Sequence, residues 1–172
     1  YIPTNGSTVQ RAAETCNESG NSEVFNDSQG VLFANTSIFS NDGTSRRISL
    51  TDGTISNRVS MEFDEIANTL KLFIDSSVLI ANNLNLTNFS KISAKYKAND
   101  SALWVNGFEV VTSTTSSNVP SGLDRLNFDG GDLNNDFYGK TKEIAYYDEI
   151  LTDLELETLT SYRSLNEMVT EL

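Results

Sequence analysis

The chain has 172 residues, of which 38% are hydrophobic, and a formal net charge of −12 at pH 7. This length predicts one domain with a full-sized core, and the acidity argues against nucleic acid or an anionic membrane surface as a partner, because phosphate binding needs clustered Lys and Arg. The chain contains no histidine, and Cys16 is its single cysteine. An internal disulfide, a Cys-based zinc site and any mechanism that needs a histidine base are therefore excluded. Membrane insertion is not expected either, since no run of 18 apolar residues occurs.

The chain opens with Tyr1-Ile2-Pro3-Thr4, which is neither a signal peptide nor an initiator-methionine terminus. We therefore expect a fragment of a longer protein or a processed product. Residues 1–20 are predicted to be a linker or first strand from an upstream module, residues 21–163 the folded domain, and residues 164–172 a C-terminal tail.

Short runs rich in Val, Ile, Phe and Tyr recur about every ten residues, separated by clusters of Asn, Asp, Gly and Ser. Alternation with period two and regular turn signals predict an all-β fold, an antiparallel two-sheet sandwich. The expected strands are Val31–Phe33, Arg47–Leu50, Arg58–Phe63, Thr69–Ile74, Val78–Ala81, Lys91–Lys97, Ala102–Asn106, Phe108–Thr112, Arg125–Phe128 and Lys142–Tyr147.

Glu62 and Asp64 alternate along one of these strands. Residues two apart on a strand point the same way, about 6.8 Å apart, and inverting glycosidases separate their carboxyl groups by a similar distance. The segment Asp64–Asn68 also reads as the turn of a hairpin. We expect a solvated acidic edge rather than a catalytic strand. The residues expected to point inward are Met61 and Phe63.

The dipeptide Asn106-Gly107 predicts a two-residue type I′ turn, which sets the register of its hairpin. The expected pairs are Val105 with Phe108, Trp104 with Glu109, and Leu103 with Val110. A second two-residue turn at Asn99-Asp100 would place Tyr96 opposite Leu103 and Ala94 opposite Val105. One face is then apolar: Ile92, Ala94, Tyr96, Leu103, Val105, Phe108 and Val110. The other face carries Lys95, Lys97, Trp104 and Glu109.

One segment near the end of the chain predicts a short helix. Thr152 followed three residues later by Glu155 forms a capping box, and Leu151 with Leu156 forms a hydrophobic staple. The helix should run from about residue 153 to residue 163 and pack on the sandwich.

Two stretches resemble concanavalin A-like lectin and glucanase domains of the laminin-G and pentraxin type. They are "SALWVNGFEV" (Ser101–Val110), similar to the central hairpin, and "LDRLNFDGGDLNNDFYGKTKEIAYYDEILTDLELETL" (Leu123–Leu159), similar to the family's ending. The resemblance implies a jelly roll over about residues 24–162. The family's glucanases carry a further Glu after the Glu-x-Asp pair, where this chain has Ile66 and Ala67. The resemblance therefore does not imply an enzyme.

The opening "YIPTNGSTVQRAAETC" resembles a linker in virion proteins of marine bacteriophages and in some bacterial surface proteins. That likeness implies a tail-fibre, appendage or head-decoration domain in a virion, bound to host-surface glycans or to other virion proteins, with a homotrimer as a plausible assembly. The alternatives are a carbohydrate-binding module of a secreted or cell-surface bacterial protein that degrades polysaccharides, and a decoration domain without a ligand. A glycoside hydrolase is the least favoured reading.

Four residues are the candidate glycan ligands. The plane of Trp104 could stack on a sugar ring while Lys95 and Glu109 bind hydroxyls, and Tyr138 could extend a site at the rim. Alternatively, Trp104 packs under the Lys stems, a loop or the helix.

A Gly-rich loop carries the candidate metal ligands. It offers hard oxygens from Asp129, Asp132, Asn134 and Asp136, a spacing that suits calcium. Phe137 stands where an EF-hand loop would need Gly, so the alternative is a turn capped by its own Asx side chains.

Overall fold

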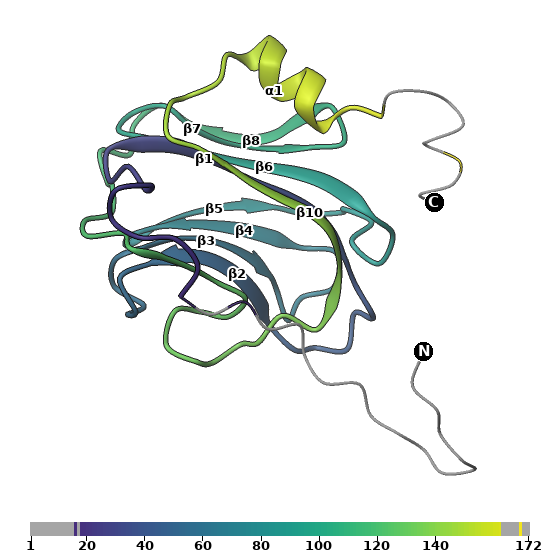
Figure 1. The fold of residues 1–172 in the computed structure, drawn as a ribbon. Coiled ribbons are helices and arrows are strands. Elements are labelled where there is room, and N and C mark those ends of the chain that lie inside the picture. The colour runs from purple at the N-terminus through teal and green to yellow at the C-terminus, as the bar shows by residue number, and fades with distance from the viewer. Residues whose placement is uncertain (1–15, 17, 163–168, 170–172) are drawn as a thin grey trace.

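The computed structural model describes Cys16, residues 18–162 and Val169, and it confirms the two-sheet antiparallel sandwich. Among residues 18–162, two five-stranded sheets face each other, with one short helix outside (Figure 1). The strands are β1 (Gln29–Ile38), β2 (Arg46–Thr51), β3 (Arg58–Phe63), β4 (Leu70–Ile74), β5 (Ser77–Ala81), β6 (Ser90–Lys97), β7 (Ser101–Val105), β8 (Phe108–Ser113), β9 (Arg125–Asn127) and β10 (Gly139–Tyr147), and the helix is α1 (Asp153–Thr160).

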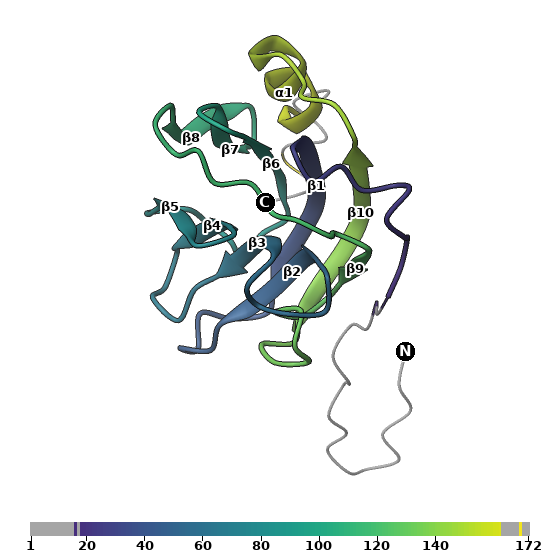
Figure 2. The ribbon, with the colours of Figure 1, turned by 90° about the vertical axis from the view of Figure 1, so that its left-hand side faces the viewer.

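The sheets have the strand orders β10-β1-β6-β7-β8 and β5-β4-β3-β2-β9. We call the first the α1 sheet, because α1 packs on its outer side over β6, β7 and β8, as Figure 2 shows, and the second the β3 sheet. In the described part of the chain no helix has the length and apolar character needed to span a bilayer.

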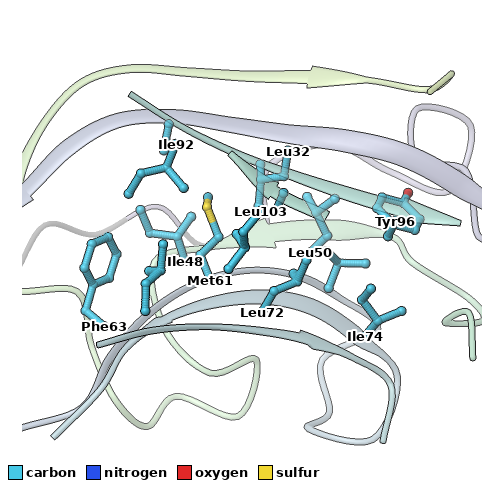
Figure 3. Close-up of a cluster of buried hydrophobic side chains, with 14 of the residues drawn as sticks. Leu32, Ile48, Leu50, Met61, Phe63, Leu72, Ile74, Ile92, Tyr96 and Leu103 are labelled. Carbon is cyan, nitrogen blue, oxygen red and sulfur yellow. The ribbon is translucent and has the colours of Figure 1, made fainter. Parts of the chain in front are cut away.

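The core lies between the sheets and follows from the alternation of side chains along each strand. Figure 3 shows the inner faces meeting, with Met61, Phe63 and Leu72 of the β3 sheet opposite Ile92 and other residues of the α1 sheet. The inward orientation expected for Met61 and Phe63 is confirmed, since their exposed fractions are 0% and 1%.

The hairpin around Asn106-Gly107 has the predicted turn, with positive φ at both residues. The first two predicted pairs form, but a β-bulge opposite the step from Leu103 to Trp104, with Val110 of β8 as the extra residue, places Leu103 opposite Val111 instead of Val110. Phe108 is 73% exposed, so its expected place in the core is wrong. The face also loses its regularity at this bulge, because the bulged strand carries an extra residue.

The turn between β6 and β7 lies one residue earlier than predicted, since the Asp100 N–H donates to the Lys97 carbonyl at 3.1 Å. Ala94 pairs with Leu103 and Ile92 with Val105, so the predicted partners of Tyr96 and Ala94 were wrong by two residues. A shift of two preserves the side-chain face, because the period of a strand is two. Ile92, Ala94 and Tyr96 are therefore buried in the core as expected.

Helix α1 begins as predicted. Thr152 is the N-cap, its side chain accepts a hydrogen bond from the Glu155 N–H, and the Glu155 carboxylate accepts one from the Thr152 N–H. The helix ends at Thr160, three residues before the predicted end, because Ser161 has an extended backbone. The predicted tail, residues 164–172, lies outside the described residues except for Val169, as does most of the predicted linker.

Candidate functional site

The outer face of the β3 sheet gathers charged, hydroxyl and aromatic side chains in cross-strand rows. Arg47 pairs with Glu62 and Glu62 with Lys71, so these three residues form one row across β2, β3 and β4. Ser60 pairs with Phe73 in the next row. Because each alternate residue of these strands points away from the core, the sandwich places all five on the same outer surface.

The two carboxylates of this face are held in ion pairs. Glu62 contacts both Arg47 and Lys71, and Lys71 Nζ lies 2.8 Å from Asp64 Oδ1. Burial opposes the charge of Lys71, but the hydrogen bond to Asp64 and the charges of Asp64 and Glu62 raise its pKa above the usual value. Both carboxylates are therefore ion-paired, Glu62 with Arg47 and Lys71, and Asp64 with Lys71.

The expectation that Glu62 and Asp64 form a solvated edge is therefore wrong. Their exposed fractions are 3% and 8%. The reason is the register, which sets a long basic side chain beside each acid, and a desolvated carboxylate needs such a partner. The turn predicted after Asp64 is present, and the Asp64 N–H donates to the Thr69 carbonyl at 3.0 Å.

Arg58, on the same face, is a buried cation whose hydrogen bonds are incomplete. It is 7% exposed, and its Nε and Nη1 find no hydrogen-bond partner among the described residues. Its guanidinium carbon lies 4.6 Å from the centroid of the Phe73 ring, which Arg47 also approaches at 5.3 Å. Burial, with the charge of Arg47, lowers the pKa of Arg58. Leaving buried donors unpaired costs free energy, so this residue is poised to gain from an acidic partner.

A pocket of about 380 Å³ opens beside this guanidinium. Its lining combines the cation and the aromatic ring with Ile55, the hydroxyls of Ser56 and Ser76, and the carboxylate of Asp75, which accepts a hydrogen bond from the Ser76 hydroxyl. A carboxylate could accept from the guanidinium there while an adjacent apolar ring face rests on Phe73. Sequence analysis missed Arg58 and Phe73; the only available signal was their outward place in alternating strands.

The four predicted glycan ligands do not form one site. Lys95 and Glu109 line a pocket of about 460 Å³ between β8 and the N-terminal end of α1. Lys95 Nζ is already paired, 2.6 Å from Asp100 and 3.6 Å from Asp153. Tyr138 lies elsewhere, at the start of β10.

Trp104 follows the alternative reading, in which it packs beneath a covering element. It is 7% exposed and lies in a cluster with Val31, Ala102 and Leu156 of α1. A sugar could not stack on this indole while α1 stays in place, because the helix covers it.

In the predicted metal loop, the side-chain oxygens of Asp129 and Asp132 accept hydrogen bonds from other residues of the same loop. Asp129 is buried, and its Oδ1 accepts from the Gly131 N–H at 2.5 Å. Asp132 accepts from the backbone and side chain of Asn134, while Asp136 is exposed. Among the described residues no group of three or more His, Cys, Asp or Glu is arranged to hold a metal ion. The turn reading accounts for these bonds, and calcium stays a prediction.

No protein-family model matches the chain, and no curated protein does. Solved structures do match. The CBM40 of Ruminococcus gnavus IT-sialidase, bound to α2,6 sialyllactose, superposes with a TM-score of 0.67 at 14% identity, over 89% of this chain and 98% of that one. The leech intramolecular trans-sialidase gives a TM-score of 0.64 at 16% identity over 81% of this chain, and the Trypanosoma rangeli sialidase 0.62 at 13% over 77%.

The coverage differs between these structures. This chain spans 24% of the leech enzyme and 22% of the trypanosome enzyme, but almost the whole of the CBM40 chain. At these identities the likeness shows the fold alone, and it agrees with the two-sheet jelly-roll sandwich.

Proposed function

We propose that this chain is a glycan-binding module that holds an acidic sugar on the outer face of the β3 sheet. The observation that carries the proposal is the Arg58 guanidinium, which is buried against Phe73 and has two nitrogens without a hydrogen-bond partner among the described residues. A carboxylate is the group that a guanidinium binds best, because both ion pairing and parallel hydrogen bonds contribute.

The structural likeness supports the same ligand class. The matching CBM40 domain was solved with α2,3 and with α2,6 sialyllactose, and a sialyl group carries a carboxylate. This chain covers 98% of that domain, so the match is to the complete binding module. We therefore assign the chain to the role expected of a carbohydrate-binding module in a secreted or cell-surface protein.

Catalysis is not part of the proposal. Glu62 and Asp64 are ion-paired with Arg47 and Lys71 and are only 3% and 8% exposed, so neither carboxylate is presented to a sugar at the surface. The virion setting was expected from the opening segment, most of which lies outside the described residues, and no finding favours it. The homotrimer likewise stays a prediction.

The test is a residue-resolved NMR titration of the labelled chain with α2,3-sialyllactose. Amide signals of β3 and β4 should shift and saturate. Arg58→Gln should weaken binding about tenfold or more, since a hydrogen bond to a charged group contributes about 1.5–3 kcal/mol. Lactose, which lacks the carboxylate, should shift these signals far more weakly.

Arg125→Gln is the matched control. Arg125 belongs to the same sheet, but its guanidinium is paired with Asp124 and Glu18. Its loss should leave the affinity for sialyllactose unchanged. Equal affinity of the wild type and Arg58→Gln, or equal shifts with lactose, would refute the proposal.

A further inference from the structure

A separate pocket lies at the rim, just beyond the last paired residues of β1 and β10. The two strands pair up to Ile38 with Gly139, so the next residues, Phe39 and Tyr138, extend from opposite strands at the same level. A register shift between Asn35 and Thr36 sets this arrangement. Both aromatic residues line a pocket of about 390 Å³.

Tyr138 is held by the residues on either side of it. Phe137 is fully buried, with ring centroids 5.4 Å from Phe63 and 5.8 Å from Phe128. A side chain at Gly139 would collide with the Ser37 carbonyl and the Phe137 ring, so only glycine permits the strand to start there. The tyrosine ring therefore projects from a rigid support, which lowers the entropy cost of binding.

The polar side chains that line the pocket are also held in place, by hydrogen bonds within the protein. Arg46 is 4% exposed; its Nη1 donates to the Thr44 carbonyl at 2.9 Å and its Nη2 lies 2.6 Å from Asp42. Asp42 also accepts from the Ser40 hydroxyl and the Thr44 N–H. The bond from Arg46 holds the pKa of Asp42 at about 2, so its carboxylate stays ionised at ordinary pH.

The exposure of the rings indicates a ligand with apolar faces. Phe39 is 48% exposed and Tyr138 37%, and Lys140 Nζ lies 5.8 Å from the centroid of the Phe39 ring, so Tyr138 offers the more open ring face. Of the described residues lining the pocket, Asp42 and Arg46 are the charged ones, and they neutralise each other. A carboxylate has about four acceptor positions, and Asp42 uses three of them here.

This combination favours a ligand that is uncharged, rich in hydroxyl donors and flat enough to stack on aromatic rings. We propose that the rim pocket between Phe39 and Tyr138 is a second binding site, for an uncharged saccharide. The sugar stacks on the rings, and a hydroxyl donates to Asp42. The site is independent of Arg58, so either site can exist without the other.

The experiment titrates labelled full chain carrying Arg58→Gln, and the wild type, with lactose and with cellobiose, and follows the amide signals of Phe39 and Tyr138. At least one disaccharide should shift these signals to saturation equally in both proteins. Tyr138→Ala should weaken that binding about tenfold, the loss expected when one stacking contact of about 1–1.5 kcal/mol is removed. Tyr138→Phe should retain it, because the ring remains.

Phe108→Ala is the matched control, since Phe108 is an exposed aromatic residue, 73% accessible, outside this pocket. It should leave rim binding unchanged. The proposal is overturned if neither neutral disaccharide saturates the rim signals or if Tyr138→Ala binds as the wild type does. Saturation by glucose 6-sulfate but by neither neutral sugar would also overturn it. Loss of sialyllactose binding in Arg58→Gln tests the other site alone.

Discussion

The two outer faces of the sandwich differ in what covers them. On the α1 sheet, the helix lies over Trp104 and makes that face a second small core. On the β3 sheet no helix packs in the described part of the chain, and the outer surface of the strands carries ion pairs and the Arg58 guanidinium, two of whose nitrogens lack a hydrogen-bond partner there. Both faces carry outward-pointing aromatic residues, so residue type alone does not separate a packing face from a binding face. The two kinds of face differ in whether another element of the fold covers them.

The largest effect on stability is expected from a substitution that disrupts the packing between α1 and the α1 sheet. Trp104→Ala should lower the free energy of unfolding by about 3–5 kcal/mol, because it leaves a cavity beneath α1. Urea denaturation followed by circular dichroism measures it. Phe108→Ala, at the exposed end of the same hairpin, should change stability far less. Similar losses in the two variants would show that α1 does not cover Trp104 in solution.

A somewhat smaller effect is expected from breaking the charged face. Glu62→Gln removes the carboxylate that Arg47 and Lys71 share, and losing one partner of a buried pair costs about 3 kcal/mol. The exposed neighbour Glu65 provides the control, because Glu65→Gln should stay within about 0.5 kcal/mol of the wild type. Equal stability of Glu62→Gln and the wild type would mean that this face is hydrated rather than locked by ion pairs.

The smallest effect concerns the helix itself. Thr152→Ala removes the N-cap of α1 and should cost about 1 kcal/mol. Thr158→Ala, exposed within the helix, should be neutral or slightly stabilising, since alanine is the better helix former. Amide hydrogen exchange of Leu156 and Thr160 should accelerate in the first variant only. Unchanged exchange in Thr152→Ala would show that packing on Trp104, rather than the cap, holds the helix.

The strands and the cap were predictable because their signals are local. Alternation along β3 and the capping box at Thr152 depend on neighbours in sequence, and both were found in place. Ile92 lies on the predicted face although the predicted register was wrong by two residues. A shift by an even number of residues does not change the face to which a side chain points. The bulge at Val110 of β8 was not predictable, because no residue type marks it.

The candidate sites depend on partners far apart in the chain, which alternation does not reveal. Glu62 was expected in solvent because its strand gives no hint that Arg47 and Lys71 flank it. Trp104 was considered for ligand binding although α1, some fifty residues later, covers it. Tyr138 was recognised, but its neighbour Phe39 follows only from the pairing of β1 with β10.

The register shift between Asn35 and Thr36 has a consequence for how such a scaffold can diversify. It sits within β1, whose flanking residues stay paired with β6 without interruption. Lys142 is the extra residue on β10, so a deletion there would remove the bulge, while the pairs on both sides of it, and with them the alignment of Phe39 and Tyr138, would keep their present partners. Length changes at this point of β10 are thus absorbed locally, and residues at the rim are free to vary without requiring a new interior.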